Sequence, residues 1–390
     1  MRTITLHYSL KWMTMPPFDY IINGMKSVKR NGRIYICHTY YHAYIAVVKE
    51  LVRRHDSQDR ADIILSTMSN DFGTLKERLE SSKVFDNVYM YDEQEDVTSE
   101  EVMKYHQDRG NIILNLLQRI KYTKLLGKLQ EDYIPTDLSK YSDVYVFCDS
   151  DPIGYYLNYK KIYYHAVEDG LNSGLLDDQA RNANRGAFPV KCAMAKMGLI
   201  FIESGYSKYC IDYEVNDISV NHKPPKNIVE EPREELNNKL SKEDHAILVS
   251  IFLENPERLV NQLLNEGRDG SDKPNVMILT EPLCELDVRK KMFEDIIEEY
   301  RDDYRVIIKP HPRDILDYSM EFPNVVVVRD KFPMEVLGDI DGFAVDKLIS
   351  VITQVDNVYF AKEIVYLGLD FLDKYEEPSI HRKTELLDAK

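Results

Sequence analysis

Short apolar runs alternate with amphipathic stretches along most of this chain. Runs with the β-branched or aromatic character of buried strands start near residues 33, 61, 87, 142 and 160, and a further one, "GLIFIES", covers 198–204. The stretches between them have helical spacing; 111–129, for example, carries apolar side chains at Ile113, Leu116, Leu117 and Ile120. Strands separated by helices predict βα units and a mostly parallel sheet.

The alternation breaks once and then starts again. Residues 216–241 are polar and include "NHKPPKNIVEEPREE", which we interpret as an interdomain linker. Beyond a helical stretch from residue 242, strands are expected at 275–283, 304–314 and 324–330. We therefore expect Rossmann-like domains at 25–215 and 242–390 that face a cleft, with ligands at the carboxyl ends of the strands. Residues 1–24 are interpreted as an N-terminal extension, because a natural start, Met25, stands just before the first strand.

Composition narrows the class of protein. The 390 residues carry a net charge of −16, which opposes a general nucleic-acid role because backbone binding needs a basic surface. Five cysteines are scattered without a CxxC pair, which fits a reducing cytosol and argues against a disulfide framework or a zinc site. No apolar run reaches the ~18 residues of a membrane span, and the first 30 residues do not have the pattern of a signal peptide.

The stretch "IIKPHPRD", 307–314, joins a β-branched strand to a turn with basic side chains. Pro312 suits the first turn of a following helix, whose free N–H groups would bind phosphate. Lys309, His311 and Arg313 add charge or hydrogen-bond donors, and His311 could pass a proton to a departing phosphate oxygen. An ordinary His-Pro turn in water is the alternative.

The stretch "YYHAVEDG", 163–170, ends a strand in two adjacent acids and a glycine. A carboxylate at the carboxyl end of a parallel strand faces the ligand crevice, and Gly170 would allow close approach of a substrate. Glu168 or Asp169 could then take a proton from an attacking hydroxyl, since adjacent carboxylates repel and one pKa is raised. Taken alone, the tripeptide has the composition of a plain turn.

The two motifs occur in different predicted domains, and together they resemble a known family. An acid-acid-glycine motif, "KPHPRD" and a later Ser/Thr motif are similar to the bacterial sialyltransferases, most of all to the lipooligosaccharide sialyltransferases of glycosyltransferase family 52. "YICHTYYHAYIAVVKEL" and "VMILTEPL" add to the resemblance, which spans roughly residues 33–354. It implies a GT-B arrangement and inverting transfer of sialic acid from CMP-sialic acid, without a metal or another cofactor.

The resemblance also implies residue roles. Glu168 or Asp169 would be the base towards the acceptor hydroxyl, and His311 would assist departure of the CMP phosphate. Lys309, Pro312 and Arg313 would lie at the donor. The Ser/Thr motif would fall in "LISVITQ", with Ser350 and Thr353 on the donor phosphate; their spacing of three fits one face of a helical turn.

Several alternatives stay open. Related sequences also carry acids just after the "LTEPL" strand, so the base could be Glu285 or Asp287. His38 and His42, at the first strand-to-helix turn, are candidate substrate contacts or simply part of a capped helix start. The DxD of "FCDSDPIG" would hold a divalent cation in a metal-dependent transferase. Other sugar donors and the CDP-glycerol polymerases share the architecture, although the latter carry basic membrane-binding helices that this pattern does not indicate. A binding protein with an inactive cleft is a third reading.

The expected partners are a nucleotide-sugar donor and a galactose-terminated saccharide of capsule or lipooligosaccharide. No nucleic acid is expected. We expect a cytoplasmic protein with peripheral contact at the cytoplasmic face of a bacterial membrane, and a homodimer is one arrangement consistent with this.

Overall fold

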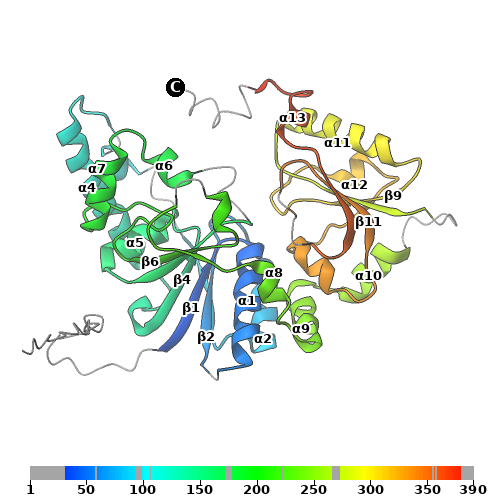
Figure 1. Ribbon diagram of the computed structural model, residues 1–390, viewed down its shortest axis with the longest axis horizontal. Helices are drawn as coiled ribbons and strands as arrows, with labels where there is room; N and C mark the ends of the chain where they lie inside the picture. The colour runs from blue at the N-terminus through cyan, green and yellow to red at the C-terminus, as the bar shows by residue number, and fades with distance from the viewer. Residues whose placement is uncertain are drawn as a thin grey trace, which may run out of the picture.

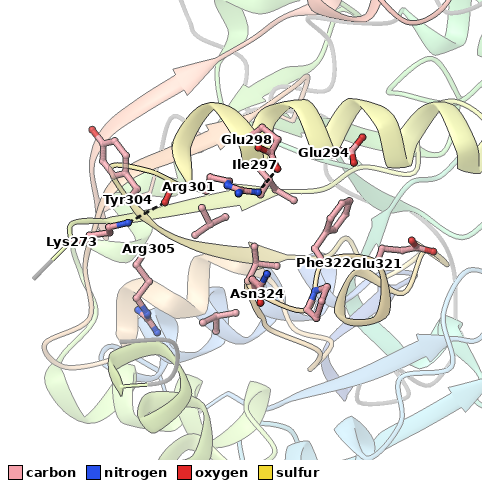
Figure 2. A pocket seen from close by; sticks show the side chains of 14 residues that line it. Lys273, Glu294, Ile297, Glu298, Arg301, Tyr304, Arg305, Glu321, Phe322 and Asn324 are labelled. Atoms are coloured by element: carbon pink, nitrogen blue, oxygen red, sulfur yellow. Dashed lines mark hydrogen bonds and ion pairs between the residues drawn. The ribbon is translucent and has the colours of Figure 1, made fainter. Parts of the chain in front are cut away.

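The computed structural model describes residues 31–57, 59–93, 99–105, 107–171, 178–221, 224–265, 273–353, 355 and 358–378. All strand pairs in these ranges are parallel, in a sheet of seven strands and a sheet of five. Figure 1 shows the two sheets in separate halves of the molecule, each covered by helices. The fold is therefore the predicted pair of Rossmann-like α/β units in a GT-B type arrangement. The proposed extension at 1–24 lies outside the described residues.

The first domain is built on the seven-stranded sheet, in the order β3-β2-β1-β4-β5-β6-β7. Its order reverses between β1 and β4, which is where such sheets bind ligands at the carboxyl edge. The strands are β1 (Asn31–Cys37), β2 (Ala61–Ser66), β3 (Val88–Tyr91), β4 (Tyr141–Phe147), β5 (Tyr164–Val167), β6 (Cys210–Val215) and β7 (Ile228–Glu230). The helices are α1 (Tyr40–Arg54), α2 (Leu75–Ser82), α3 (Glu100–Met103), α4 (Ile112–Leu129), α5 (Pro152–Lys160), α6 (Gln179–Ala183) and α7 (Phe188–Lys196).

The second domain has the strand order β10-β9-β8-β11-β12, with the reversal between β8 and β11. The strands are β8 (Asn275–Leu279), β9 (Arg305–Lys309), β10 (Val326–Val327), β11 (Val345–Ser350) and β12 (Ala361–Tyr366). The helices from the junction onwards are α8 (Arg233–Asn237), α9 (Lys242–Phe252), α10 (Pro256–Asn265), α11 (Leu286–Tyr300), α12 (Tyr318–Glu321), the 3₁₀ helix η6 (Met334–Asp339) and α13 (Leu369–Leu372).

The structure corrects three local predictions. "GLIFIES" pairs with no strand; Ile200, Phe201 and Ile202 are fully buried by packing instead, and the sixth strand is β6. The predicted linker at 216–241 carries β7, which pairs with β6, and α8. Ser350 ends a strand and Thr353 lies beyond it, so the two do not share a helical turn.

Helix α9 joins the two domains. Its N-cap Ser241 and Asp244 form a capping box, and Asp244 also accepts from His55 at the end of α1 (3.0 Å). Phe252 meets the Tyr44 ring edge-on at 5.7 Å, and α9 also packs on η6 of the second domain. One hydrophobic cluster therefore runs from α1 and α2 through α9 to β8, β9 and β11. In Figure 1, α9 lies below α1 and α8, at the junction of the two halves.

Candidate active site

His38 lies directly after β1 and is 1% exposed. Its Nδ1 is 2.9 Å from the carbonyl oxygen of Phe147 at the end of β4, and its Nε2 is 2.8 Å from Glu93 Oε2 and 3.4 Å from Asp151 Oδ2. All these partners are acceptors, so both ring nitrogens donate. Burial lowers the pKa of His38, but the charges of Glu93 and Asp151 outweigh it and raise the pKa to about 9. A buried imidazolium therefore bridges the switch point of the first sheet.

His42 lies in the first turn of α1, behind the N-cap Thr39, and is fully buried. Its Nδ1 accepts from the backbone N–H of His38 (3.1 Å), so the hydrogen of the neutral ring is on Nε2. Nε2 then donates to the carbonyl oxygen of Asp169 (2.6 Å) and faces its Oδ1 (3.1 Å). Both nitrogens of His42 are occupied inside the protein, so its ring is placed to orient Asp169.

Asp169 and Glu168 face different surroundings. The Asp169 side chain is 55% exposed; partial burial raises its pKa, but the hydrogen bond from His42 and the charge of His38 lower it to about 2. Glu168 is 1% exposed, accepts from the backbone N–H of Asn216 (2.8 Å) and lies 3.8 Å from Arg233. Asp169 is thus the acid of this motif that a ligand can reach.

Gly170 has open space beside it. Its φ is not in the left-handed region, and an added Cβ would meet no described atom within 4 Å. No backbone strain requires glycine here, and no atom of the described residues fills the space beside it.

The DxD acids point in different directions. Asp149 is buried and accepts from the Tyr164 hydroxyl (2.7 Å) and the Ser204 N–H (2.8 Å), while Asp151 faces His38. Burial raises the pKa of both acids to about 6. Cys148, just before them, has a φ of 59°, a strained conformation for a residue with a side chain. No group of three metal-ligating side chains occurs among the described residues. The Asp149 carboxylate already accepts hydrogen bonds from Tyr164 and Ser204, so this arrangement does not favour binding of a divalent cation by the DxD acids.

His311 lies at the carboxyl edge of the second sheet, just after β9. Its backbone N–H donates to Thr280 Oγ1 (3.1 Å), and its Nδ1 accepts from the Arg313 N–H (3.1 Å), which places the ring hydrogen on Nε2. Burial and the charges of Arg313 and Lys309 lower its pKa to about 4. In the free protein His311 is therefore a neutral hydrogen-bond donor.

The turn around His311 differs from the prediction in two ways. No helix starts at Pro312; the next one, α12, begins at Tyr318, so this turn offers no helix N-terminus to a phosphate. Lys309 is 4% exposed, and its Nζ donates to two backbone carbonyls, of Pro310 and Asp330 (3.3 Å each). Burial lowers the pKa of Lys309 to about 8. Arg313 is the exposed cation of the motif.

The carboxylate of Glu281 lies at the backbone N–H groups of the predicted Ser/Thr motif. Glu281, two residues after β8, accepts from the backbone N–H groups of Ile352 (3.0 Å) and Thr353 (2.6 Å). Ser350 is fully buried, and its hydroxyl donates to the Thr353 carbonyl oxygen (2.7 Å) and lies 3.3 Å from Glu281. Glu281 thus fills an anion-binding turn at the switch point of the second sheet, where Ser350 and Thr353 were expected to bind phosphate. An acid two residues after a buried strand was the sequence signal for it.

The other candidate acids, Glu285 and Asp287, lie at the start of α11. Glu285 is the N-cap residue but makes no side-chain capping bond, and both side chains are exposed. They remain reachable candidates for a base.

The two sets of residues gather on two sheet edges. Among the contacts of the described residues, none joins Asp169 to His311. The charge of Glu335, in η6, acts both on Lys309 at the end of β9 and on Tyr41 at the start of α1. Burial raises the pKa of Glu335 itself to about 7, against the effect of Lys309. The end of β9 and the start of α1 therefore both lie near Glu335, a half-buried acid that the sequence did not single out.

Comparison with known proteins gives the class of the protein. The sequence profile of glycosyltransferase family 52 matches residues 85–353, more than half of the chain. An uncharacterized protein of Haemophilus influenzae is 34% identical over 97 residues, which are 24% of this chain and 31% of that protein. The chain thus matches less than a third of the length of that relative.

Solved structures are similar at low identity. The GT-B domain of a sialyltransferase from Photobacterium damselae is 14% identical with a TM-score of 0.47, over 85% of this chain and 90% of that one. A UDP-GlcNAc 2-epimerase from Neisseria meningitidis is 12% identical with a TM-score of 0.41, over 82% and 77%.

The two parallel α/β domains form a fold of the GT-B type, and the profile match over residues 85–353 gives the family. The chain belongs to glycosyltransferase family 52.

Proposed function

We propose that this glycosyltransferase moves sialic acid from CMP-sialic acid to a galactose-terminated saccharide of capsule or lipooligosaccharide, with inversion and without a metal. The observation that carries the proposal is the exposed, ionised Asp169 held by His42 on one sheet edge, with His311 on the edge of the other sheet. Membership of family 52, together with the motifs that resemble its sialyltransferases, supports this donor.

The acceptor side of the reaction falls to Asp169. Its pKa of about 2 keeps it ionised at neutral pH, so it is ready to accept the proton of the acceptor hydroxyl as the new bond to the anomeric carbon forms. His42 fixes the carboxylate by donating from Nε2, and the backbone N–H of His38 fixes His42.

The donor side falls to His311. Its Nε2–H is the donor for the phosphate oxygen of CMP as the bond between that oxygen and the anomeric carbon breaks. A phosphate anion beside the ring raises its pKa from the value of about 4 in the free protein, so the bound donor itself creates the acid. Arg313, exposed next to His311, supplies positive charge to the same phosphate.

The donor is tested directly by incubating the protein with CMP-sialic acid and a galactoside, with and without EDTA, and separating product from released CMP. CDP-glycerol and UDP-sugars form the comparison panel. We expect transfer from CMP-sialic acid that EDTA does not abolish. Transfer only from another donor overturns the donor assignment, and loss with EDTA that manganese restores would return the role to the Asp149–Asp151 pair.

The residue roles are tested by three variants. Asp169→Asn and His311→Ala should each lower kcat by ~10²–10⁴-fold, the usual contribution of a general acid or base. Glu168→Gln is the matched control and should keep a near-normal rate, because Glu168 is buried against Asn216 and Arg233. If Asp169→Asn keeps its activity while Asp287→Asn or Glu285→Gln loses it, the base lies at the start of α11.

A further inference from the structure

Helices α4 and α7 expose an unusual number of large apolar side chains. In the first two turns of α4 these are Ile112 (60% exposed), Ile113 (66%), Leu114 (49%) and Leu117 (51%). In and after α7 they are Val190 (49%), Met197 (58%) and Leu199 (37%). We call these seven residues, with the lysines described below, the α4–α7 face. Exposed apolar side chains gathered in one place mark interaction sites more often than scattered ones do.

The two helices lie against each other. Leu116 and Ile120 of α4 and Cys192 of α7 pack on one small buried cluster that contains Met194 and Ala195. Tyr122, Leu125, Leu126 and Leu129 pack on the core of the first domain, whereas Ile113 and Leu117, four residues apart, lie together on an uncovered side of α4. Figure 1 shows α4 and α7 together on the side of the first domain that is remote from the second domain.

The α4–α7 face is basic, although the chain as a whole carries a charge of −16. Ile113, Leu117, Lys121, Lys124 and Lys128 follow each other at spacings of four, four, three and four, which lines them up along one side of α4. The sequences of α4 and α7 contain no acid, and Lys196 adds an exposed cation. Within the described part of the chain, no carboxylate forms an ion pair with Lys121, Lys124 or Lys128.

We propose that the α4–α7 face docks the protein on an anionic phospholipid membrane. Apolar side chains at the start of α4 would enter the interface between headgroups and acyl chains, and the lysines further along would meet lipid phosphates, as in interfacial amphipathic helices. In the described residues no helix is long and apolar enough to span a membrane. Charge favours a membrane over a second copy of the chain on this face. In a symmetric dimer the same basic face of the second copy would lie against these lysines, whereas an anionic bilayer complements their charge.

Along the chain, the α7 part of this face follows the segment that contains the candidate base. Helix α6 is the first described helix after the Asp169 motif, and α7 follows it directly. Docking through α7 would hold the first domain, which carries Asp169, at the lipid surface, and this suits a saccharide carried on a lipid. The lipid-binding claim itself does not depend on the donor.

Vesicle co-sedimentation tests the proposal with the full chain. One set of vesicles is phosphatidylcholine alone, and the other is phosphatidylcholine mixed with phosphatidylglycerol. We expect binding to the mixed vesicles that weakens with added salt, because the Debye length shortens. Lys121→Gln/Lys124→Gln/Lys128→Gln should bind about 100-fold more weakly, at about fivefold for each cation near an anionic surface. Ile113→Ser/Leu117→Ser should weaken binding in low and high salt alike.

The matched control is Lys226→Gln/Lys239→Gln/Lys242→Gln, which removes the same charge from exposed positions elsewhere. It should bind the mixed vesicles like the unchanged protein, and all variants should keep their rate on a soluble galactoside. If the control variant lost as much vesicle binding, net charge alone would explain the effect of the lysines, and the proposal would be overturned. So would a dimer without lipid that Ile113→Ser/Leu117→Ser converts to a monomer while vesicle binding is absent, since the face would then be a subunit interface.

Discussion

Asp169 is held by a buried histidine. His42 is fully buried, accepts from the backbone with Nδ1 and donates to Asp169 with Nε2. Its ring also stacks on Phe147, with centroids 4.9 Å apart, so its orientation is fixed on both sides. His42 is therefore a positioning residue, and its effect on rate should pass through the carboxylate of Asp169.

Replacing His42 should change both the rate and its pH dependence. His42→Leu removes the hydrogen bond that lowers the pKa of Asp169, so this pKa should rise from about 2 towards the ordinary value of about 4. Activity that needs ionised Asp169 is lost as the pH falls through that pKa, so the acid limb of kcat/KM against pH should move upward. We expect kcat to fall by at least ~10-fold with little change in KM.

His42→Gln is the matched variant, because its amide N–H can still donate to Asp169. It should recover part of the rate and keep the acid limb low. A fall in kcat with an unmoved acid limb in both variants would mean that His42 only supports the fold.

The sequence alone does not show which of Glu168 and Asp169 is exposed to a ligand. Glu168 and Asp169 follow the end of β5 at Val167, and both faces of a parallel sheet are covered, so the apolar pattern does not say which acid is buried. The contacts that separate them, Arg233 for Glu168 and His42 for Asp169, come from helices far along the chain. The same limit hid Glu281, whose partners lie 71 and 72 residues away.

At the scale of elements, the alternation of apolar runs predicted the βα units because central strands such as β2, β8 and β9 are buried on both faces. The prediction failed where a segment is buried without pairing in a sheet, and where a strand pairs in a sheet without being buried. "GLIFIES" is as apolar as a strand, yet packing alone buries Ile200 and Ile202, whereas β7 is short and exposed and sits among prolines and charges. Ser350 and Thr353 were identified from the motif, but their strand-end geometry depends on pairing with β8 and β12.

A buried charge network holds α1, β6 and α8 together. Arg233 donates to Glu214 (2.8 Å) and lies 3.8 Å from Glu168, while Lys49 contacts Glu214 and Glu231. Burial raises the pKa of Glu214, but Lys49 and Arg233 outweigh it and lower the pKa to about 2. The network fixes the strand end from which Asp169 projects.

Arg233→Met should therefore destabilise the protein by about 3–5 kcal/mol, because it leaves buried carboxylates without their cation. Urea unfolding at neutral pH measures the change. Lys347→Met, which breaks the more exposed pair with Glu363 (2.7 Å), is the matched control and should cost no more than about 1 kcal/mol. Equal costs in the two variants would contradict a buried network.

At the scale of the whole molecule, the two domains share one core. The hydrophobic cluster that contains α1 and β2 of the first domain also contains β8, β9 and β11 of the second, and α9 lies between them. Tyr44 and Phe252 are almost fully buried at this junction, and Lys331 pairs with Asp71 directly across it (3.7 Å). A shared core of this kind makes the placement of His311 relative to Asp169 a property of the whole fold.

This shared core predicts that the domains unfold together. Phe252→Ala removes a 1% exposed aromatic ring from the junction and should lower the free energy of unfolding by about 3–5 kcal/mol. Hydrogen exchange should then speed up by the same factor in β1 and in β8, because both strands open only in global unfolding. Met320→Ala, at a position 79% exposed on α12, is the control and should leave both strands unchanged. Faster exchange in β8 alone would show that the second domain opens by itself, so that α9 would act as a hinge between independent domains.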